Sequence, residues 1–259
     1  MREKKSEPTL SPIAENLVLG LPVHCLDDYS AYLLSRLETG VGTHVVTLNA
    51  EMVIQGEKNH VLAEIIRQAE LVVPDGAGVV LYLRLKGKSV GRCPGIELAE
   101  SLLCQASKQN PQNLVFFYGG KPGVAMKAAE TWQEKVPELA IAERGVSRIT
   151  CQHGYLSPAE EKELLQTLAQ LQPRLIFVGL GVPRQELWIA KHKHICPQAI
   201  WIGIGGSLDI WAGVKERAPA WFCDNSLEWL YRLYQEPWRW RRMLALPQFA
   251  WKTLMEIKF

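Results

Sequence analysis

The stretch Leu175-Ile176-Phe177-Val178-Gly179-Leu180-Gly181 sets the fold class of this chain. Four apolar residues in a row, with branched and aromatic side chains, are typical of a strand that is buried on both faces. The glycines that follow permit a sharp turn at the end of the strand, and a helical segment begins soon after it. A buried strand, a turn and a helix in succession form the repeating unit of a parallel α/β sheet.

The same unit recurs along the chain. Short apolar runs predict four more buried strands and a weaker sixth one: residues 44–48, 71–74, 114–118 and 200–204, with 139–142 as the weaker run. Amphipathic segments predict helices between them: residues 57–69, 96–107, 124–136 and 157–171. Ser157, with Pro158 after it and Glu160 three residues on, has the pattern of a capped helix start. The alternation predicts a doubly wound, mainly parallel α/β sheet whose functional loops follow the carboxyl ends of the strands.

Size and composition narrow the class of protein. The chain has 259 residues, of which 47% are apolar, and this is enough to form a packed core. A net charge of only +2 argues against a nucleic-acid-binding protein. The six cysteines form no Cys-x-x-Cys pair, so reduced thiols in a cytosolic protein are expected. We find neither a secretory signal nor a run of about 18 apolar residues that could span a bilayer.

The composition changes after about residue 212. We expect residues 1–212 to form the α/β domain, with residues 1–15 as a flexible tail, and residues 213–259 to form a helical appendage. The appendage is rich in tryptophan, with Trp221, Trp229, Trp238, Trp240 and Trp251. Tryptophan favours the headgroup region of a bilayer and arginine is attracted to anionic lipids, so peripheral membrane contact is predicted. Packing of the tryptophans on the core, or in the interface of a homo-oligomer, is the alternative.

Polar residues follow two of the predicted strands. Thr47 and Asn49 lie two residues apart, on one side of an extended chain, where they could bind a sugar or a phosphate. Capping of the next helix by Asn49 is an equally good interpretation. Asp75 lies between a strand and a glycine turn, a position suited to acid–base chemistry. On local sequence alone, capping of the following helix is the favoured interpretation of Asp75.

Glycine-rich segments provide further candidate sites. Arg92, in a Gly/Pro turn before a helix, suits a phosphate or a carboxylate, and a solvated surface arginine is the alternative. The turns at residues 119–123, 178–186 and 203–209 would let a ligand approach the backbone closely. None of them completes a P-loop or a dinucleotide-binding pattern, so a nucleotide cofactor is poorly supported. No ligand spacing for a metal is found either, so no metal is expected.

Taken in this order, the segments resemble the WecG/TagA/CpsF family of glycosyltransferases. The motifs cover roughly residues 17–245 and form a specific set: Thr-x-Asn at 47–49, Pro-Asp-Gly-x-Gly at 74–78, Gly-Arg-x-Pro-Gly at 91–95, Gly-Gly-Lys-Pro-Gly at 119–123, Gly-Leu-Gly-x-Pro-Arg-Gln-Glu at 179–186 and Gly-Gly-x-x-Asp at 205–209. Arg-Ala-Pro-x-Trp at 217–221 and the segment 227–237 belong to the same set.

The resemblance implies a Rossmann-like fold and an inverting, metal-independent transfer of N-acetylmannosamine, or a related N-acetylhexosamine or uronic acid, from a UDP-sugar. The implied acceptor is N-acetylglucosamine on undecaprenyl diphosphate. The protein is therefore expected in the cytoplasm, on the inner face of the cell membrane, in cell-surface polysaccharide synthesis.

The resemblance also assigns residues. It changes the interpretation of Asp75 from a helix cap to the catalytic base, with Thr47, Asn49 and Arg92 as the other catalytic candidates. A metal-free site needs cations to offset the charge of the departing UDP. The candidates for substrate binding, including two such arginines, are Gln185, Asp209, Gly181, Gly205, Gly206, Arg217 and Arg232.

Two other functions remain open at this point. An oxidoreductase with a nucleotide cofactor could use the same kind of sheet, although the incomplete glycine patterns argue against it. A non-catalytic module that recruits polymer-assembly enzymes to the membrane is the third possibility. The joint presence of Thr47, Asn49, Asp75 and Gln185 favours a working active site.

Overall fold

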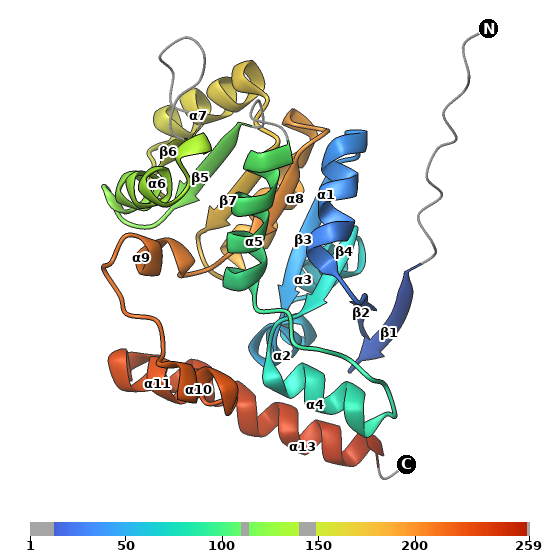
Figure 1. Cartoon of the computed structure of the whole chain (residues 1–259). Coiled ribbons are helices and arrows are strands. Elements are labelled where there is room, and N and C mark those ends of the chain that lie inside the picture. The colour runs from blue at the N-terminus through green and yellow to red at the C-terminus, as the bar shows by residue number, and fades with distance from the viewer. Residues whose placement is uncertain (1–12, 110–113, 140–148, 258–259) are drawn as a thin grey trace, which may run out of the picture.

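The computed structural model describes residues 13–109, 114–139 and 149–257, and its centre is a parallel six-stranded sheet (Figure 1). The strand order is β4-β3-β8-β7-β5-β6. The strands are β3 (Thr43–Leu48), β4 (Leu71–Pro74), β5 (Val115–Gly119), β6 (Ile149–Gln152), β7 (Leu175–Gly179) and β8 (Ile200–Gly203). The predicted α/β, Rossmann-like sheet is thus confirmed, and five strands lie within a residue or two of their predicted bounds.

The sixth strand is not where the sequence suggested. Leu139 ends the short 3-10 helix η1 (Pro137–Leu139), and residues 140–142 lie outside the described part of the chain. The sixth strand is β6 instead, which pairs with β5 at the edge of the sheet. β6 reads Ile-Thr-Cys-Gln, and its polar residues interrupt the apolar run, which is why the run before it seemed the better candidate.

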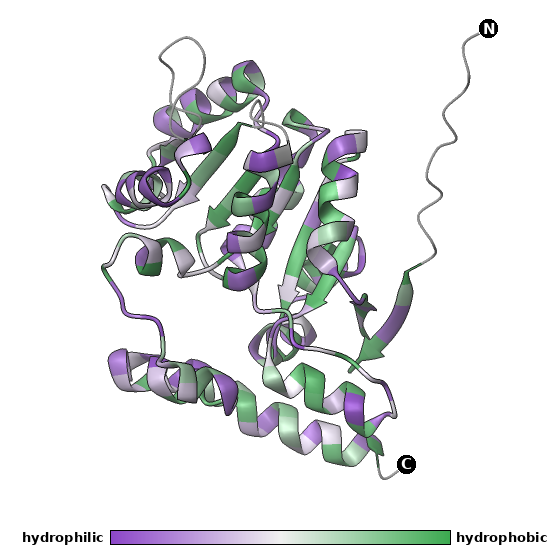
Figure 2. Ribbon diagram, viewed as in Figure 1, coloured by the Kyte–Doolittle hydropathy of each residue, from purple (hydrophilic) through white to green (hydrophobic). Residues whose placement is uncertain are grey.

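Both faces of the sheet are buried, as the strand sequences require. Val45, Phe117 and Phe177 pack in one cluster, whereas the residues that precede or follow them, such as Val46 and Ile176, pack on the opposite face. This alternation follows from the two-residue period of a strand. Figure 2 shows the result, with strands that are hydrophobic along most of their length.

Helices cover the two faces. On one face lie α1 (Tyr29–Thr39), α5 (Gly95–Gln109), α6 (Val124–Lys135) and α9 (Ser207–Trp211). On the other lie α2 (Ala50–Lys58), α3 (His60–Arg67), α4 (Ala77–Leu85), α7 (Pro158–Leu171) and α8 (Arg184–His192), which is followed by η2 (Lys193–Ile195). The helix predicted at 57–69 is in fact two, because Asn59 ends α2 and caps α3. The capped start of α7 at Ser157 is confirmed.

The N-terminal region is more ordered than predicted. β1 (Ala14–Val18) and β2 (Leu21–Cys25) form an antiparallel hairpin beside the main sheet. The prediction of a flexible tail over residues 1–15 is therefore wrong for its last two residues, which belong to β1. Val18 and Val23 are fully buried against α2, α3 and β4. This burial of apolar side chains explains why the hairpin is held in place.

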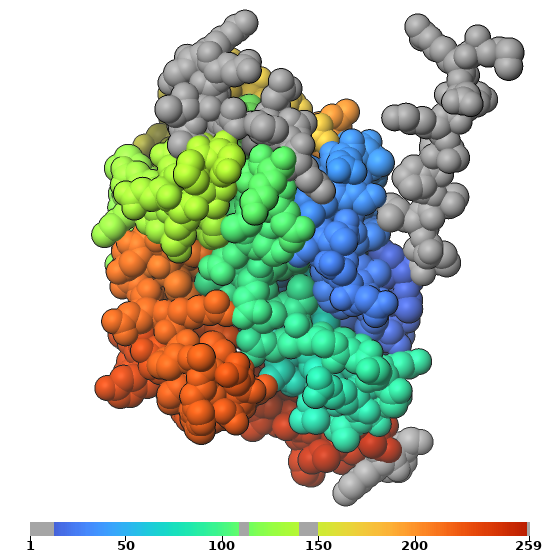
Figure 3. Space-filling model, in the orientation of Figure 1, coloured from blue at the N-terminus to red at the C-terminus, as the bar shows by residue number. Residues whose placement is uncertain are grey.

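The C-terminal helices lie across the carboxyl ends of the strands (Figures 1 and 3). They are α10 (Ala220–Asp224), α11 (Glu228–Gln235), η3 (Pro237–Arg239), α12 (Trp240–Met243) and α13 (Ala245–Ile257). Ala245, Phe249 and Thr253, each four residues apart, form the buried stripe of α13 and pack it against α2 and α4. Within the described residues, no helix is both long and apolar enough to cross a bilayer.

β3 and β8 form the topological switch point of the sheet, which is where doubly wound sheets have their ligand-binding crevice. β3 is followed by α2 on one face of the sheet, and β8 is followed by α9 on the other. Loops that leave neighbouring parallel strands toward opposite faces open a space at the carboxyl edge, where ligands bind in doubly wound sheets. The fold therefore places its binding position beside the ends of β3 and β8.

Candidate active site

Three loops meet tightly at the end of β3. The Thr47 hydroxyl is buried and donates to the Gly203 carbonyl of β8, at 3.2 Å. A β-carbon on Gly95, the first residue of α5, would lie 2.8 Å from the Thr47 methyl group, and one on Gly76 would lie 2.9 Å from the β-carbon of Asn49. Both distances are too short for a real side chain, so the loops after β3 and β4 and the start of α5 approach closely because these positions are glycine.

Asn49 caps α2, as one of its two interpretations required. Its Oδ1 atom accepts a hydrogen bond from the Met52 amide at 3.1 Å. Its side chain is half-buried at the same loop junction as Gly76. Capping uses only the oxygen of the amide, so the cap and a role in ligand binding through Nδ2 are compatible.

Asp75 does not cap the helix that follows it. The N-cap residue of α4 is Gly76, which makes no side-chain cap, and the local interpretation of Asp75 as that cap is therefore wrong. Its Oδ1 atom instead accepts from the Gly95 amide at the start of α5, at 3.1 Å. Burial raises the pKa of Asp75 to about 6, against the opposing effects of Arg232, the Gly95 hydrogen bond and Arg92. A carboxylate with a pKa close to neutrality is suited to general base catalysis.

The charges of two arginines and one glutamate act on this carboxylate. Arg92 lies 3.4 Å from one oxygen of Glu228 in α11, and Arg232, one helical turn further on, lies 2.5 Å from the other. Glu228 also acts to raise the pKa of Asp75, so the four groups share one electrostatic environment. The cluster joins the loop after β4 to a C-terminal helix through Glu228, and its charges act on Asp75.

The other candidate arginine of the C-terminal segment, Arg217, is engaged elsewhere. Arg217 pairs with Glu97 in the first turn of α5. Asp209, in α9, accepts from Lys215 at 2.9 Å, and Lys215 also contacts Glu236 at 3.2 Å. These ion pairs hold the connection to the C-terminal helices against the α/β core. The structure thus places Arg217 and Asp209 near the start of the appendage, and both already have a charged partner.

The glycine turns after β7 and β8 are joined by one side chain. Gln185 is buried, and its Oε1 atom accepts from the amides of both Gly181 and Gly205, at 3.1 and 3.0 Å. The two turns therefore keep a fixed spacing beside the crevice. Gly206 follows directly and its carbonyl accepts from the Asp209 amide at the start of α9.

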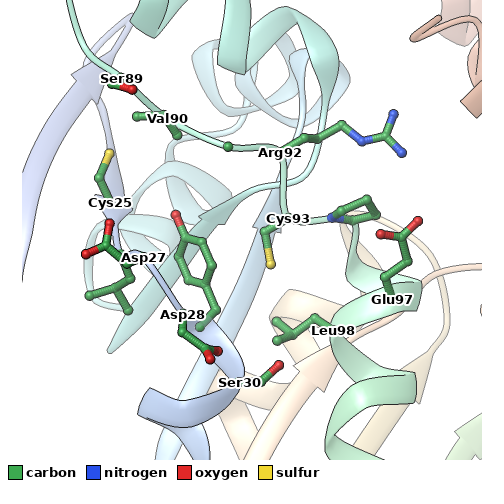
Figure 4. A pocket seen from close by; sticks show the side chains of 14 residues that line it. Cys25, Asp27, Asp28, Ser30, Ser89, Val90, Arg92, Cys93, Glu97 and Leu98 are labelled. Atoms are coloured by element: carbon green, nitrogen blue, oxygen red, sulfur yellow. The ribbon is translucent and has the colours of Figure 1, made fainter. Parts of the chain in front are cut away.

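A cavity of about 540 Å³ lies next to this cluster (Figure 4). Its walls come from the segment between β2 and α1 and from the loop that carries Arg92 into α5. Asp27, Asp28, Ser30 and Ser89 give it a polar lining, while the Arg92 guanidinium points away from Asp27 and Asp28. The loop of Arg92 is tied to β4, because the Cys93 amide donates to the Pro74 carbonyl at 2.9 Å. The loop that lines the cavity is thus anchored to the strand that ends directly before Asp75.

Sequence reasoning missed three charged residues of this region. Glu228, Lys215 and Glu186 each contact a predicted site residue, namely Arg232, Asp209 and Gln185. The spacing of Glu228 and Arg232, four residues apart on a helix, is a signal that could have identified one pair. The pairing of Arg92 with Glu228 joins residues 136 positions apart, and no local pattern contains it.

Fold and site together define an α/β protein whose parallel sheet carries an aspartate of raised pKa and an arginine pair at its carboxyl edge. A family model described as "Glycosyl transferase WecG/TagA/CpsF family" matches residues 17–259, and the chain belongs to this family of glycosyltransferases. Membership favours glycosyl transfer over the oxidoreductase and the non-catalytic alternatives.

Curated relatives are similar over most of the chain. A protein of Bacillus spizizenii is 36% identical over 242 residues, which is 90% of either chain. One of Bacillus subtilis is 33% identical over 223 residues, or 86% of this chain and 83% of the relative. One of Staphylococcus aureus is 34% identical over 209 residues, or 80% and 78%. All three are named N-acetylglucosaminyldiphosphoundecaprenol N-acetyl-beta-D-mannosaminyltransferase.

Proposed function

We propose that this glycosyltransferase moves N-acetylmannosamine, or a related N-acetylhexosamine or uronic acid, from UDP to N-acetylglucosamine on an undecaprenyl diphosphate. The transfer inverts the anomeric centre and needs no metal. The observation that carries the proposal is Asp75, a carboxylate with a raised pKa beside Arg92 and Arg232. The names of the relatives support the sugar and the lipid-linked acceptor.

The chemical step is an in-line displacement. The acceptor hydroxyl oxygen attacks the anomeric carbon, Asp75 takes the hydroxyl proton, and the bond from that carbon to the UDP oxygen breaks on the opposite side. The electron pair of the broken bond leaves with UDP. Asp75 supports this role because it is largely ionised at neutral pH and yet basic enough to accept a proton.

The arginines would stabilise the leaving group. The diphosphate gathers negative charge as the bond breaks, and Arg92 and Arg232 are cations at the place where this charge develops. Both are paired with Glu228 in the structure, so the diphosphate would replace that carboxylate as their partner. Arg217 is a third cation that could join them if its pairing with Glu97 opens.

The other predicted residues would hold the substrates. Thr47 and Asn49 stand beside Asp75 at the end of β3, where they can orient the acceptor or the transferred sugar. We assign the donor to the β7–β8 side of the crevice, where the turns are held by Gln185. There the turn glycines, Gly181, Gly205 and Gly206, and the carboxylate of Asp209 are the candidate contacts for the nucleotide.

The C-terminal segment would place the site at the inner membrane surface, where a lipid-linked acceptor lies. All five of its tryptophans are exposed, with Trp238 at 71% and Trp251 at 66%, which argues against the alternative of packing on the core. Arg241 stacks on Trp240, with 5.5 Å between the guanidinium carbon and the ring centre. Exposed indoles with neighbouring cations suit an anionic bilayer surface. We therefore retain residues 213–259 as a membrane-associating appendage on a 1–212 catalytic domain.

The deciding experiment compares wild type with Asp75→Asn. Both are assayed with UDP-N-acetylmannosamine and a short-chain N-acetylglucosamine diphospholipid, with and without EDTA. We expect Asp75→Asn to lower kcat by about 10²–10⁴, the usual range for loss of a general base. UDP affinity should stay within about threefold, since that interaction is made by other residues. Near-normal turnover by the variant would exclude Asp75 as the base, and loss of wild-type activity in EDTA would exclude the metal-free scheme.

A further inference from the structure

Glu186 is a buried carboxyl group that the proposed reaction does not use. It lies in the first turn of α8, its side chain is 0% exposed, and within the described residues it forms no ion pair. Its Oε1 atom accepts from the Gln185 side chain at 2.8 Å, and its Oε2 atom has no hydrogen-bond partner there. Burial of a carboxyl group with one oxygen unpaired costs free energy, so we expect this residue to have a function.

The partner of Glu186 is the side chain that joins the two glycine turns. Gln185 uses its oxygen for the Gly181 and Gly205 amides and its nitrogen for Glu186. Only the oxygen of an amide side chain can accept these two backbone hydrogen bonds. If the Gln185 amide flipped, its NH2 group would point at the Gly181 and Gly205 N–H groups, which are also donors. Glu186 prevents the flip because its Oε1 atom accepts a hydrogen bond from the Gln185 Nε2 atom.

The end of β8 packs closely against this pair. A β-carbon on Gly203 would lie 2.4 Å from the Gln185 nitrogen and 2.9 Å from the Glu186 oxygen. The two side chains therefore fill the space that a side chain at the end of β8 would need. The Gly203 carbonyl in turn accepts from Thr47, so one set of contacts reaches from α8 to the end of β3.

We propose that Glu186 is a positioning residue for the donor nucleotide: it fixes the Gln185 amide, and Gln185 holds the turns after β7 and β8 at the spacing that the nucleotide requires. This rests on the proposed function, because it takes the β7–β8 side of the crevice as the donor site. Glu186 touches no substrate in this scheme and acts through Gln185 alone.

The protonation state of Glu186 does not disturb this arrangement. Burial raises the pKa of Glu186 to about 7, so both forms are present near neutrality. The neutral acid keeps a carbonyl oxygen that can accept from Gln185, as the carboxylate does. A glutamine at this position also keeps such an oxygen, whereas a methionine of similar shape does not.

Two variants and one control test the proposal. Glu186→Gln should bind UDP within about twofold of wild type, and Glu186→Met should bind it about tenfold more weakly, the size expected when a buried hydrogen bond is lost and its partner is left unsatisfied. The acceptor KM should not change in either variant. Leu164→Ala, in the buried side of α7, is the control for general loss of stability. It should lower the Tm without weakening UDP binding.

Hydrogen exchange gives a readout that needs no substrate. In Glu186→Met, the Gly181 and Gly205 amides should exchange faster relative to the rest of the sheet, and in Glu186→Gln they should not. Equal UDP affinity of Glu186→Met and wild type, or equal weakening by both variants or by Leu164→Ala, would overturn the proposal. If wild type itself fails to bind UDP, the proposed function is wrong, and the donor role of Glu186 is wrong with it.

Discussion

At the scale of single residues, the balance of effects on Asp75 decides what it can do. A hydrogen bond from the Gly95 amide and two nearby arginines favour the charged carboxylate, yet its pKa lies above the ordinary value because burial outweighs them. A carboxylate stabilised only by these contacts would be too weak a base. The site therefore combines burial, which raises basicity, with cations that keep the group charged at neutral pH.

The pH dependence of catalysis should report this balance. Because Asp75 must be deprotonated to accept the acceptor proton, kcat/KM should fall as pH drops through about 6. A pH–rate profile with a saturating donor and a soluble acceptor measures it. An acid limb near the ordinary aspartate value, about 4, would contradict the raised pKa in the working enzyme.

Stability should respond in the opposite sense. The folded protein holds Asp75 with a higher pKa than the unfolded chain, so the ionised group destabilises the fold at pH values above about 6, and this penalty disappears as pH falls toward 4. Asp75→Asn should therefore raise the free energy of unfolding by about 1–3 kcal/mol near pH 8 and by less near pH 5. Urea unfolding at both pH values tests this, and a gain that is equal at both, or larger near pH 5, would contradict the expected linkage.

Sequence patterns identified several of these residues because they follow strands. Thr47, Asn49 and Asp75 stand at strand ends, and the parallel sheet brings those ends to one edge. Their partners could not be predicted in the same way. Glu228 pairs with Arg92 because the C-terminal helices fold back across the sheet. The hydrogen bond from the Gly95 amide to Asp75 depends on the position of the first residue of α5.

At the scale of elements, α11 controls the charge at the site. It supplies Arg232, which lowers the pKa of Asp75, and Glu228, which raises it. Replacement of Glu228 by glutamine removes one negative charge and keeps the shape of the side chain. We expect the acid limb of the kcat/KM profile to move to lower pH, because the carboxylate of Asp75 then has one repulsive neighbour fewer.

The same variant should change nucleotide affinity. Without the Glu228 carboxylate, Arg92 and Arg232 are free to bind the diphosphate. UDP should therefore bind several-fold more tightly, which is about the effect of one surface ion pair. Glu64→Gln on α3 is the matched control: among the described residues, this exposed carboxylate pairs with Arg67 and Gln68 at the end of the same helix. Weaker UDP binding in Glu228→Gln would mean that Glu228 orients the arginines instead of competing for them.

Elements were predictable where their pattern is strong and local. Five buried strands and the capped start of α7 follow directly from sequence. The hairpin of β1 and β2 was missed because only part of each strand is buried, so neither strand forms a continuous apolar run. The break between α2 and α3 was missed because Asn59 interrupts a continuous amphipathic run with a cap, and a cap inside such a run is hard to distinguish from an exposed polar residue.

At the scale of the whole molecule, the C-terminal segment combines a buried stripe with an exposed apolar surface. Phe249 packs beside Tyr82, with ring centres 6.3 Å apart, while Trp238 and Trp251 face outward. Removal of the whole segment would therefore uncover α2 and α4 as well as remove the indoles. Substitution of exposed residues is the better test of membrane contact.

We expect Trp238→Ser combined with Trp251→Ser to lower binding to vesicles of phosphatidylglycerol and phosphatidylethanolamine by about fivefold or more, because two indoles are lost from the interface. Co-sedimentation measures the bound fraction. Val61→Ser, an exposed apolar residue on α3, is the control and should bind as wild type does. Unchanged binding of the double variant, with a loss of self-association in solution, would assign the tryptophans to a subunit interface instead.

The packing of α13 on α2 and α4 connects the C-terminal helix to the loops of the candidate site. This helix rests on α2, which starts directly after Asn49, and on α4, which starts directly after Asp75 and Gly76. Lys252 of α13 pairs with Glu57 of α2, and Lys86 at the end of α4 contacts Glu256 of α13. Arg242, in the preceding helix α12, pairs with Glu51 of α2. If α13 docks on a bilayer as proposed, a tilt of this helix would move α2 and α4 together, and with them the loops that carry Asn49 and Asp75.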